Sequence, residues 1–356
     1  MRGASSVDRF RRGLLLSAPA VLAAPLLNAC AGSPVRGAAD VAAALEARLA
    51  AQDRPGFLAL FASTTGAQAL GARFFDNLGG RSVTIAAPAP HRLQVRWSLP
   101  GEPTVVSEAF LTLAGDQIAN LTAATTGTEW LGDQPIVNVE SGLVVATATQ
   151  SQAGRWLAAA KSGLSALGSV LPAGQKWLRP LVLLAPLDLL GFARYAGPGA
   201  SALAAVTVVP GTSGSQGVRV VVNPLAPNDA PTEAATVTHE AVHAGMVSPR
   251  LTGTPGWLVE GIAEALTARA HPSVAATNGT LARSAIENGI PSELPQLLNP
   301  DPAGYALAQI AVDAMVHQVG WTAVFAEARA RSAPRGPIIA DSQVLAWYRD
   351  ALAALN

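Results

Sequence analysis

The pattern of apolar positions along the chain changes its period near residue 80. Before that point apolar residues recur at helical spacing, as at Val41, Leu45 and Leu49. After it, apolar and polar residues alternate, which is the period of a half-buried strand. The pattern predicts helices over 40–51, 55–62 and 67–78, and then strands over 81–86, 91–98, 104–112 and 117–122. Helices followed by an antiparallel meander indicate a compact α+β domain over residues 38–125.

The second half of the chain mixes the two periods. Strands are expected over 136–147, 181–184, 204–209 and 218–222, and helices over 153–170, 187–195, 232–244, 257–270, 305–319, 322–330 and 342–355. The pattern predicts a second domain over residues 130–356, with a mixed sheet and a helical C-terminal part. The element order of the first domain resembles the cystatin-like or nuclear-transport-factor-like roll, which implies an accessory binding or scaffolding role.

The first thirty residues have the features of a targeting segment. A basic start with Arg9, Arg11 and Arg12 precedes an uncharged stretch over 13–29, which is short for a spanning helix. Residues 27–30, Leu-Asn-Ala-Cys, resemble a bacterial lipobox, which implies a lipid on Cys30 and attachment to the outer face of the cytoplasmic membrane. We therefore expect a signal peptide and lipobox over 1–30 and a tether over 31–38. A cleaved signal with an incidental cysteine is the alternative, and Sec and Tat export both remain open.

Composition narrows the possible partners. The formal net charge is zero and 13% of the residues are charged, compared with about 25% in an average soluble domain. No basic stripe is visible, so nucleic acid is not an expected partner. Cys30 is the only cysteine, which excludes an internal disulfide and a cysteine nucleophile in the folded part.

The chemistry is concentrated in the segment His239-Glu240-Ala241-Val242-His243. Residues four apart share a face of a helix, so the two histidines can bind one metal ion. Glu240 lies one step round the helix, beside the metal, where it can polarise a water molecule. Glu260, in the next predicted helix, can supply a third ligand. Two imidazoles and one carboxylate are a zinc ligand set that leaves one position open, so the sequence predicts a hydrolytic zinc site.

This segment and Trp257-Leu258-x-Glu260-Gly261-x-Ala263-Glu264 resemble the gluzincin, or peptidase MA-like, clan of zinc metallopeptidases. The resemblance covers roughly residues 130–356 and is strongest over 232–270. It implies that His239, His243 and Glu260 are the zinc ligands and that Glu240 is the general base. It also implies that the strand pair before the motif supplies a sheet edge that holds the substrate in an extended form.

Four further residues are candidates for supporting roles. Glu264, one turn after Glu260, can hydrogen-bond the outer nitrogen of a ligand histidine. Relatives often use a downstream Tyr or His to stabilise the oxyanion, and here Tyr305 and His317 compete for that role. Gly261 is expected to let the two metal-bearing helices approach closely.

The function expected from these features is a membrane-anchored zinc metallopeptidase with a peptide or protein substrate. The alternative is a non-catalytic binding or scaffold lipoprotein of the cell envelope that keeps a peptidase-like fold.

Overall fold

A computed structural model of the chain describes residues 37–99, 101–132, 136–140, 143–147, 150–172, 180–197, 199–200, 202–212, 217–245, 253–297, 301–333 and 336–355. The described residues form a mixed α+β structure with two sheets, so the predicted fold class is confirmed. The predicted signal peptide, its Cys30 and residues 31–36 of the tether lie outside the described residues.

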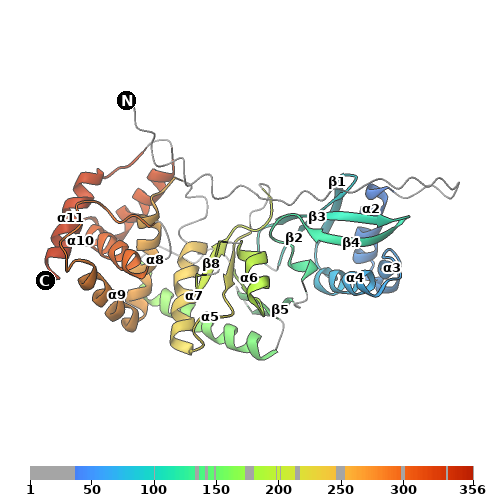
Figure 1. Cartoon of the computed structure of the whole chain (residues 1–356), viewed down its shortest axis with the longest axis horizontal. Helices are drawn as coiled ribbons and strands as arrows, with labels where there is room; N and C mark the ends of the chain where they lie inside the picture. The colour runs from blue at the N-terminus through green and yellow to red at the C-terminus, as the bar shows by residue number, and fades with distance from the viewer. Residues whose placement is uncertain are drawn as a thin grey trace. The chain divides into compact units, whose positions relative to one another are not determined.

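The N-terminal elements form helices packed on an antiparallel meander, as predicted. Helices α2 (Ala38–Ala50), α3 (Arg54–Leu58) and α4 (Thr65–Leu78) precede strands β1 (Val83–Ala89), β2 (Arg92–Trp97), β3 (Val105–Ala114) and β4 (Gln117–Ala123). The strands pair in the order β1-β2-β3-β4. Helix α2 contacts β1 and β2, and α4 contacts β4 (Figure 1). A short 3-10 helix, η1 (Glu129–Leu131), follows the sheet.

The second sheet is mixed, as predicted, and has the order β5-β6-β7-β9-β8. Its strands are β5 (Ile136–Glu140), β6 (Leu143–Thr147), β7 (Leu181–Ala185), β8 (Ala205–Val208) and β9 (Arg219–Val222). The three central strands β6, β7 and β9 run parallel. Strand β8 pairs with β9 in the antiparallel direction and lies at the edge of the sheet.

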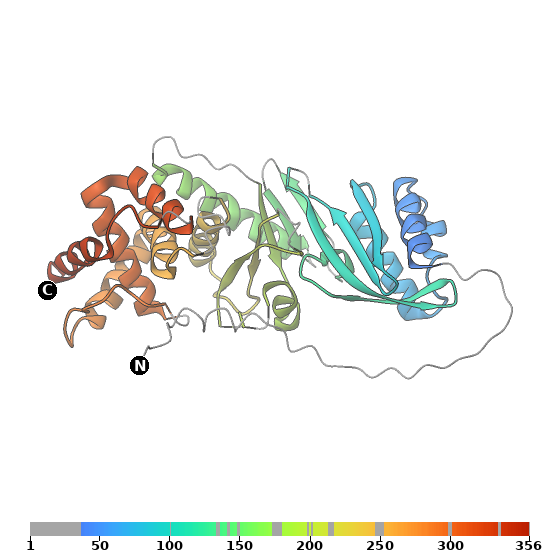
Figure 2. The same ribbon diagram turned by 90° about the horizontal axis from the view of Figure 1, so that it is seen from above.

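The remaining helices are α5 (Gln150–Val170), α6 (Leu189–Ala196), α7 (Ala230–Gly245), α8 (Gly256–Ala270), α9 (Pro272–Ala285), α10 (Pro302–Ser332) and α11 (Asp341–Ala353). Helix α10 contacts α8, α9 and α11, so the last four helices gather in one group (Figure 2). The two helices predicted over 305–330 are joined in α10, which is interrupted at Gly320, where φ is 77°. Helix α9 was not predicted from the sequence.

The second sheet separates two hydrophobic cores. Strand β7 is buried along its whole length, with Leu181 and Leu183 in a core shared with α5, α7 and α8. Val182 and Leu184 alternate with them and lie in the other core, together with the N-terminal helices and sheet. Successive strand residues point to opposite faces, so both faces of the sheet are covered, as the apolar composition of β7 requires.

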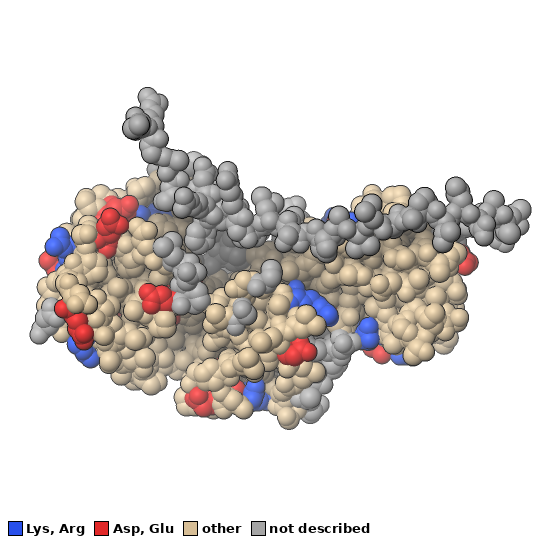
Figure 3. Space-filling view, viewed as in Figure 1, with Lys and Arg blue, Asp and Glu red and all other residues tan. Residues whose placement is uncertain are grey.

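Residues 36–356 form one compact unit by their contacts, and the second core contains residues from both sides of the predicted boundary at 125–130. Whether residues 38–125 form an independent accessory domain stays a prediction. The face in Figure 3 shows only scattered Lys, Arg, Asp and Glu side chains.

A buried ion cluster links β9 to the N-terminal part. The Nε and Nη2 atoms of Arg219 each donate a 3.0 Å hydrogen bond to the carboxylate of Glu102, and the same guanidinium pairs with Glu129 of η1. The guanidinium also lies 4.5 Å from the ring centroid of Trp97. The side chain of Arg219 is fully buried, so its charge depends on these partners for compensation.

We predict that Arg219→Met destabilises the fold by about 3–5 kcal/mol, because it leaves two buried carboxylates without their cation while keeping most of the side-chain volume. The matched control is Arg54→Met, whose ion pair with Asp76 is exposed and is expected to contribute less than about 1 kcal/mol. Urea unfolding of both variants measures the difference. Equal effects would contradict a structural role for the buried cluster.

Candidate metal centre

Helix α7 begins at a capped turn and packs closely on its neighbours. The Asp229 carboxylate accepts a 2.9 Å hydrogen bond from the backbone N–H of Thr232, which satisfies a free donor of the first turn. A Cβ atom at Gly163 of α5 would lie 2.6 Å from the carbonyl oxygen of Ala234, so the glycine permits the close contact of α5 with α7. The apolar face of α7 is thereby held in the core, and His239 and His243 remain partly accessible on another face.

Helix α8 supplies Glu260 and is held against α10. A Cβ atom at Gly261 would overlap the carbonyl oxygen of Ala308 and lie 2.7 Å from Val312 Cγ2. The expectation that Gly261 allows α7 and α8 to approach one another is therefore wrong, because the close approach is between α8 and α10. This packing places Glu260 opposite the two histidines of α7.

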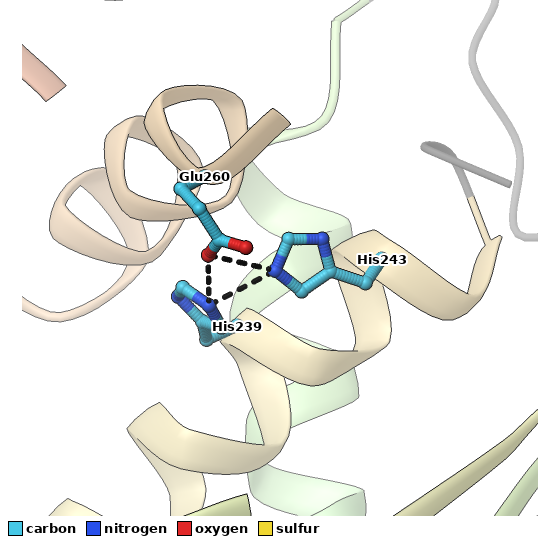
Figure 4. A group of neighbouring side chains, drawn as sticks. All are labelled: His239, His243 and Glu260. Carbon is cyan, nitrogen blue, oxygen red and sulfur yellow. Dashed lines mark hydrogen bonds and ion pairs between the residues drawn. The ribbon is translucent and has the colours of Figure 1, made fainter. Parts of the chain in front are cut away.

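Three side chains converge on one point (Figure 4). His239 Nε2 and His243 Nε2 are 3.0 Å apart, and each lies 3.2 Å from Glu260 Oε2. A tetrahedral zinc ion with bonds of about 2.0–2.1 Å holds its ligand atoms about 3.3 Å apart. The three donor atoms are thus spaced as such an ion requires. Imidazole and carboxylate donors suit zinc, and imidazole also suits other transition metals, so the donor set fits the expected cofactor without identifying it.

Glu264 lies behind His239, in the position expected from the sequence. Its Oε1 atom is 3.2 Å from His239 Nδ1. A carboxylate only accepts hydrogen bonds, so Nδ1 carries the proton that it receives. In neutral His239, Nε2 then has its lone pair free and directed towards Glu260 and His243.

The carboxylates dominate the electrostatics of the site. Burial alone would lower the pKa of His239, but its hydrogen bonds to Glu260 and Glu264 raise that pKa well above the ordinary value of 6.5. Burial opposes ionisation of Glu260 and Glu264, but the neighbouring imidazoles outweigh it and lower the pKa of both carboxyls. Without a metal, the two carboxylates therefore favour the positive form of the His239 imidazole that lies between them.

Glu240 lies beside the three converging residues but is not one of the converging donors. Its side chain forms a hydrogen bond with the edge of the sheet. Its side chain is almost fully buried, and its Oε2 atom accepts a 2.6 Å hydrogen bond from the hydroxyl of Thr207 on β8. Sequence reasoning placed a strand over 204–209 but missed Thr207, because strand periodicity carries no signal for a contact to a helix 33 residues later.

A cavity of about 750 Å³ opens over this group. One wall is residues 203–207 at the sheet edge, and the others come from α7, α8, α9 and Tyr305. The described lining residues include three carboxylates and no Lys or Arg. Tyr305 has its ring centroid 6.4 Å from that of His239, and burial raises the pKa of its phenol to about 12. His317 is solvent-exposed and does not line the cavity, so of the two oxyanion candidates the structure brings only Tyr305 to the site.

No known family model matches this chain, and no curated protein is similar to it in sequence. The chemical interpretation of the site therefore rests on the residues of this chain alone.

We predict that the purified chain binds about one zinc ion and that His239→Ala abolishes this binding, because two donors alone hold zinc weakly. The matched control, His317→Ala, removes an exposed histidine on α10 and should leave zinc content unchanged. Elemental mass spectrometry after reconstitution with zinc measures both. Loss of zinc in the control variant, or retention in His239→Ala, would refute the site.

The raised pKa of His239 predicts that zinc affinity depends on pH. Zinc requires the neutral imidazole at Nε2, so binding must displace the proton that the neighbouring carboxylates stabilise. Affinity should fall as pH falls through the raised pKa, by about tenfold per unit for one displaced proton. Competition titrations from about pH 6 to pH 8 measure this slope. An affinity that is flat above the ordinary histidine pKa of 6.5 would contradict the predicted direction.

Proposed function

We propose that the chain is an exported zinc metallopeptidase that hydrolyses peptide bonds. The observation that carries this proposal is the convergence of His239, His243 and Glu260 beside Glu240, in a cavity walled by an edge strand. It supports the three ligand roles and the general-base role that the gluzincin resemblance implies. A zinc ion held there would supply a Lewis acid and lower the pKa of a water molecule for attack.

Glu240 is the residue that moves the proton. Its carboxylate takes a proton from the attacking water and then delivers it to the leaving amine. The hydrogen bond from Thr207 holds one oxygen of Glu240 in place and leaves the other for the water. A carboxylate that is held through one oxygen and has its second oxygen available suits a residue that positions the attacking water and is not itself a metal ligand.

The edge strand β8 supports an extended peptide as the substrate. Only one side of β8 is paired within the described sheet, and residues 203–207 line the cavity next to Glu240. An extended peptide can add to such an edge through backbone hydrogen bonds, which bring a peptide carbonyl alongside the helix that carries the base.

Tyr305 is suited to stabilise the reacting carbonyl. A phenol with a pKa of about 12 keeps its proton at neutral pH, so it can donate a hydrogen bond to the negative charge that develops on the carbonyl oxygen. His317 is exposed, so it is not placed to donate this hydrogen bond.

The proposal includes anchoring through a lipid on Cys30, which places the enzyme on the outer face of the cytoplasmic membrane. Within the described part of the chain, no helix has the length and apolar character needed to cross a bilayer.

We predict that Glu240→Gln lowers peptide hydrolysis by about 10²–10⁴-fold, because it removes the base, and that zinc content stays unchanged. The matched control is Glu287→Gln, an exposed carboxylate after α9, which should keep full activity. Cleavage of a mixed peptide library, read by mass spectrometry, measures each variant. Full activity in Glu240→Gln would refute the mechanism. Equal capture of a peptide by both proteins without cleavage would favour the non-catalytic scaffold instead.

A further inference from the structure

A row of polar side chains continues from Glu264 into the group of C-terminal helices. Asn278 of α9 uses its Nδ2 atom twice: it donates to Glu264 Oε2 at 2.9 Å and to Gln309 Oε1 at 2.8 Å. Gln309 of α10 donates in turn from Nε2 to Asp313 at 3.2 Å. Asn278 and Gln309 are both buried, with 8% of their surface exposed, so water does not easily replace these bonds.

The direction of every hydrogen bond in this row is determined by its two ends. Asp313 can only accept, and it also accepts a 3.2 Å hydrogen bond from Arg269. Gln309 must therefore turn its nitrogen to Asp313 and its oxygen to Asn278. Glu264 can also only accept, so both hydrogens of the Asn278 amide are used and its orientation is unique. A flipped amide would place its oxygen against two other oxygens.

We propose that Asn278 is a positioning residue of the metal centre, which acts on His239 through Glu264. With its Oε2 atom held by Asn278, Glu264 presents Oε1 to His239 Nδ1, and this contact selects the tautomer and the ring plane that direct Nε2 at the metal. Gln309 and Asp313 keep Asn278 in its orientation. The inference rests on the proposed metal site but not on peptidase activity.

A purely structural role is the competing explanation, because the same bonds connect α8, α9 and α10. The two roles differ in what they predict for a double variant. If Asn278 acts through Glu264, its substitution costs no zinc affinity once Glu264 is removed, and the two effects are not additive. If Asn278 only braces the helices, its effect on zinc affinity persists without Glu264.

The experiment is a double-mutant cycle on the full chain with Asn278→Leu, Glu264→Ala and both together. Asn278→Leu keeps the side-chain size and adds no charge, and it should weaken zinc binding about 10–100-fold in chelator competition. The double variant should bind zinc as Glu264→Ala does. Thr280→Ala, an exposed position on α9 outside the row, is the control and should match wild type. If Asn278→Leu does not fold cooperatively by circular dichroism, Asn278→Ala replaces it.

Two results would overturn the inference: an Asn278→Leu affinity within about twofold of wild type, or full additivity in the cycle. If wild type itself bound no zinc, the proposed function would fail, and proton NMR of the metal-free chain would decide the inference separately. The hydrogen-bonded Nδ1 proton of His239 should give a downfield signal in wild type and in Thr280→Ala. This signal should be absent in Asn278→Leu. Retention of that signal in Asn278→Leu would refute the positioning role.

Discussion

The burial of β7 and β9 on both faces is the constraint on which the rest of this structure depends. Val220 and Val222 face the core that contains α7, whereas Arg219 and Val221 face the N-terminal part. A strand covered on both sides requires a layer of structure on each. Helix α7 is one such layer, and because its apolar face is used against the sheet, its two histidines can only lie away from it.

Two networks of polar side chains have different roles in this structure. The Arg219 cluster pairs one guanidinium with two buried carboxylates and connects the sheet to the N-terminal elements. The row from His239 through Glu264 and Asn278 is satisfied bond by bond, but one end opens on a cavity. Such a network rigidifies its surroundings only when each member has its partner. The first network contributes to the fold, and the second orders a site.

The sequence predicted most elements because their apolar residues repeat with a clear period. It missed α9, whose segment is rich in Ala, Thr and Ser and buries only Asn278 and Ala282 along the helix itself. A helix with so few buried apolar positions has almost no hydrophobic period to detect. The remaining signal was Pro272 at its first turn, a position that proline favours. Missing α9 meant missing Asn278 as well.

What the sequence determined by itself is local: the histidines four residues apart on one helix, the glutamate between them, and Glu264 one turn after Glu260. Helix periodicity places such residues on a shared face wherever the helix lies. Only the tertiary structure decided that Thr207 meets Glu240, that Tyr305 reaches the cavity while His317 does not, and that Gly261 faces α10. These contacts join segments far apart in the chain, so they depend on how the two cores bring helices and strands together, which no local repeat records.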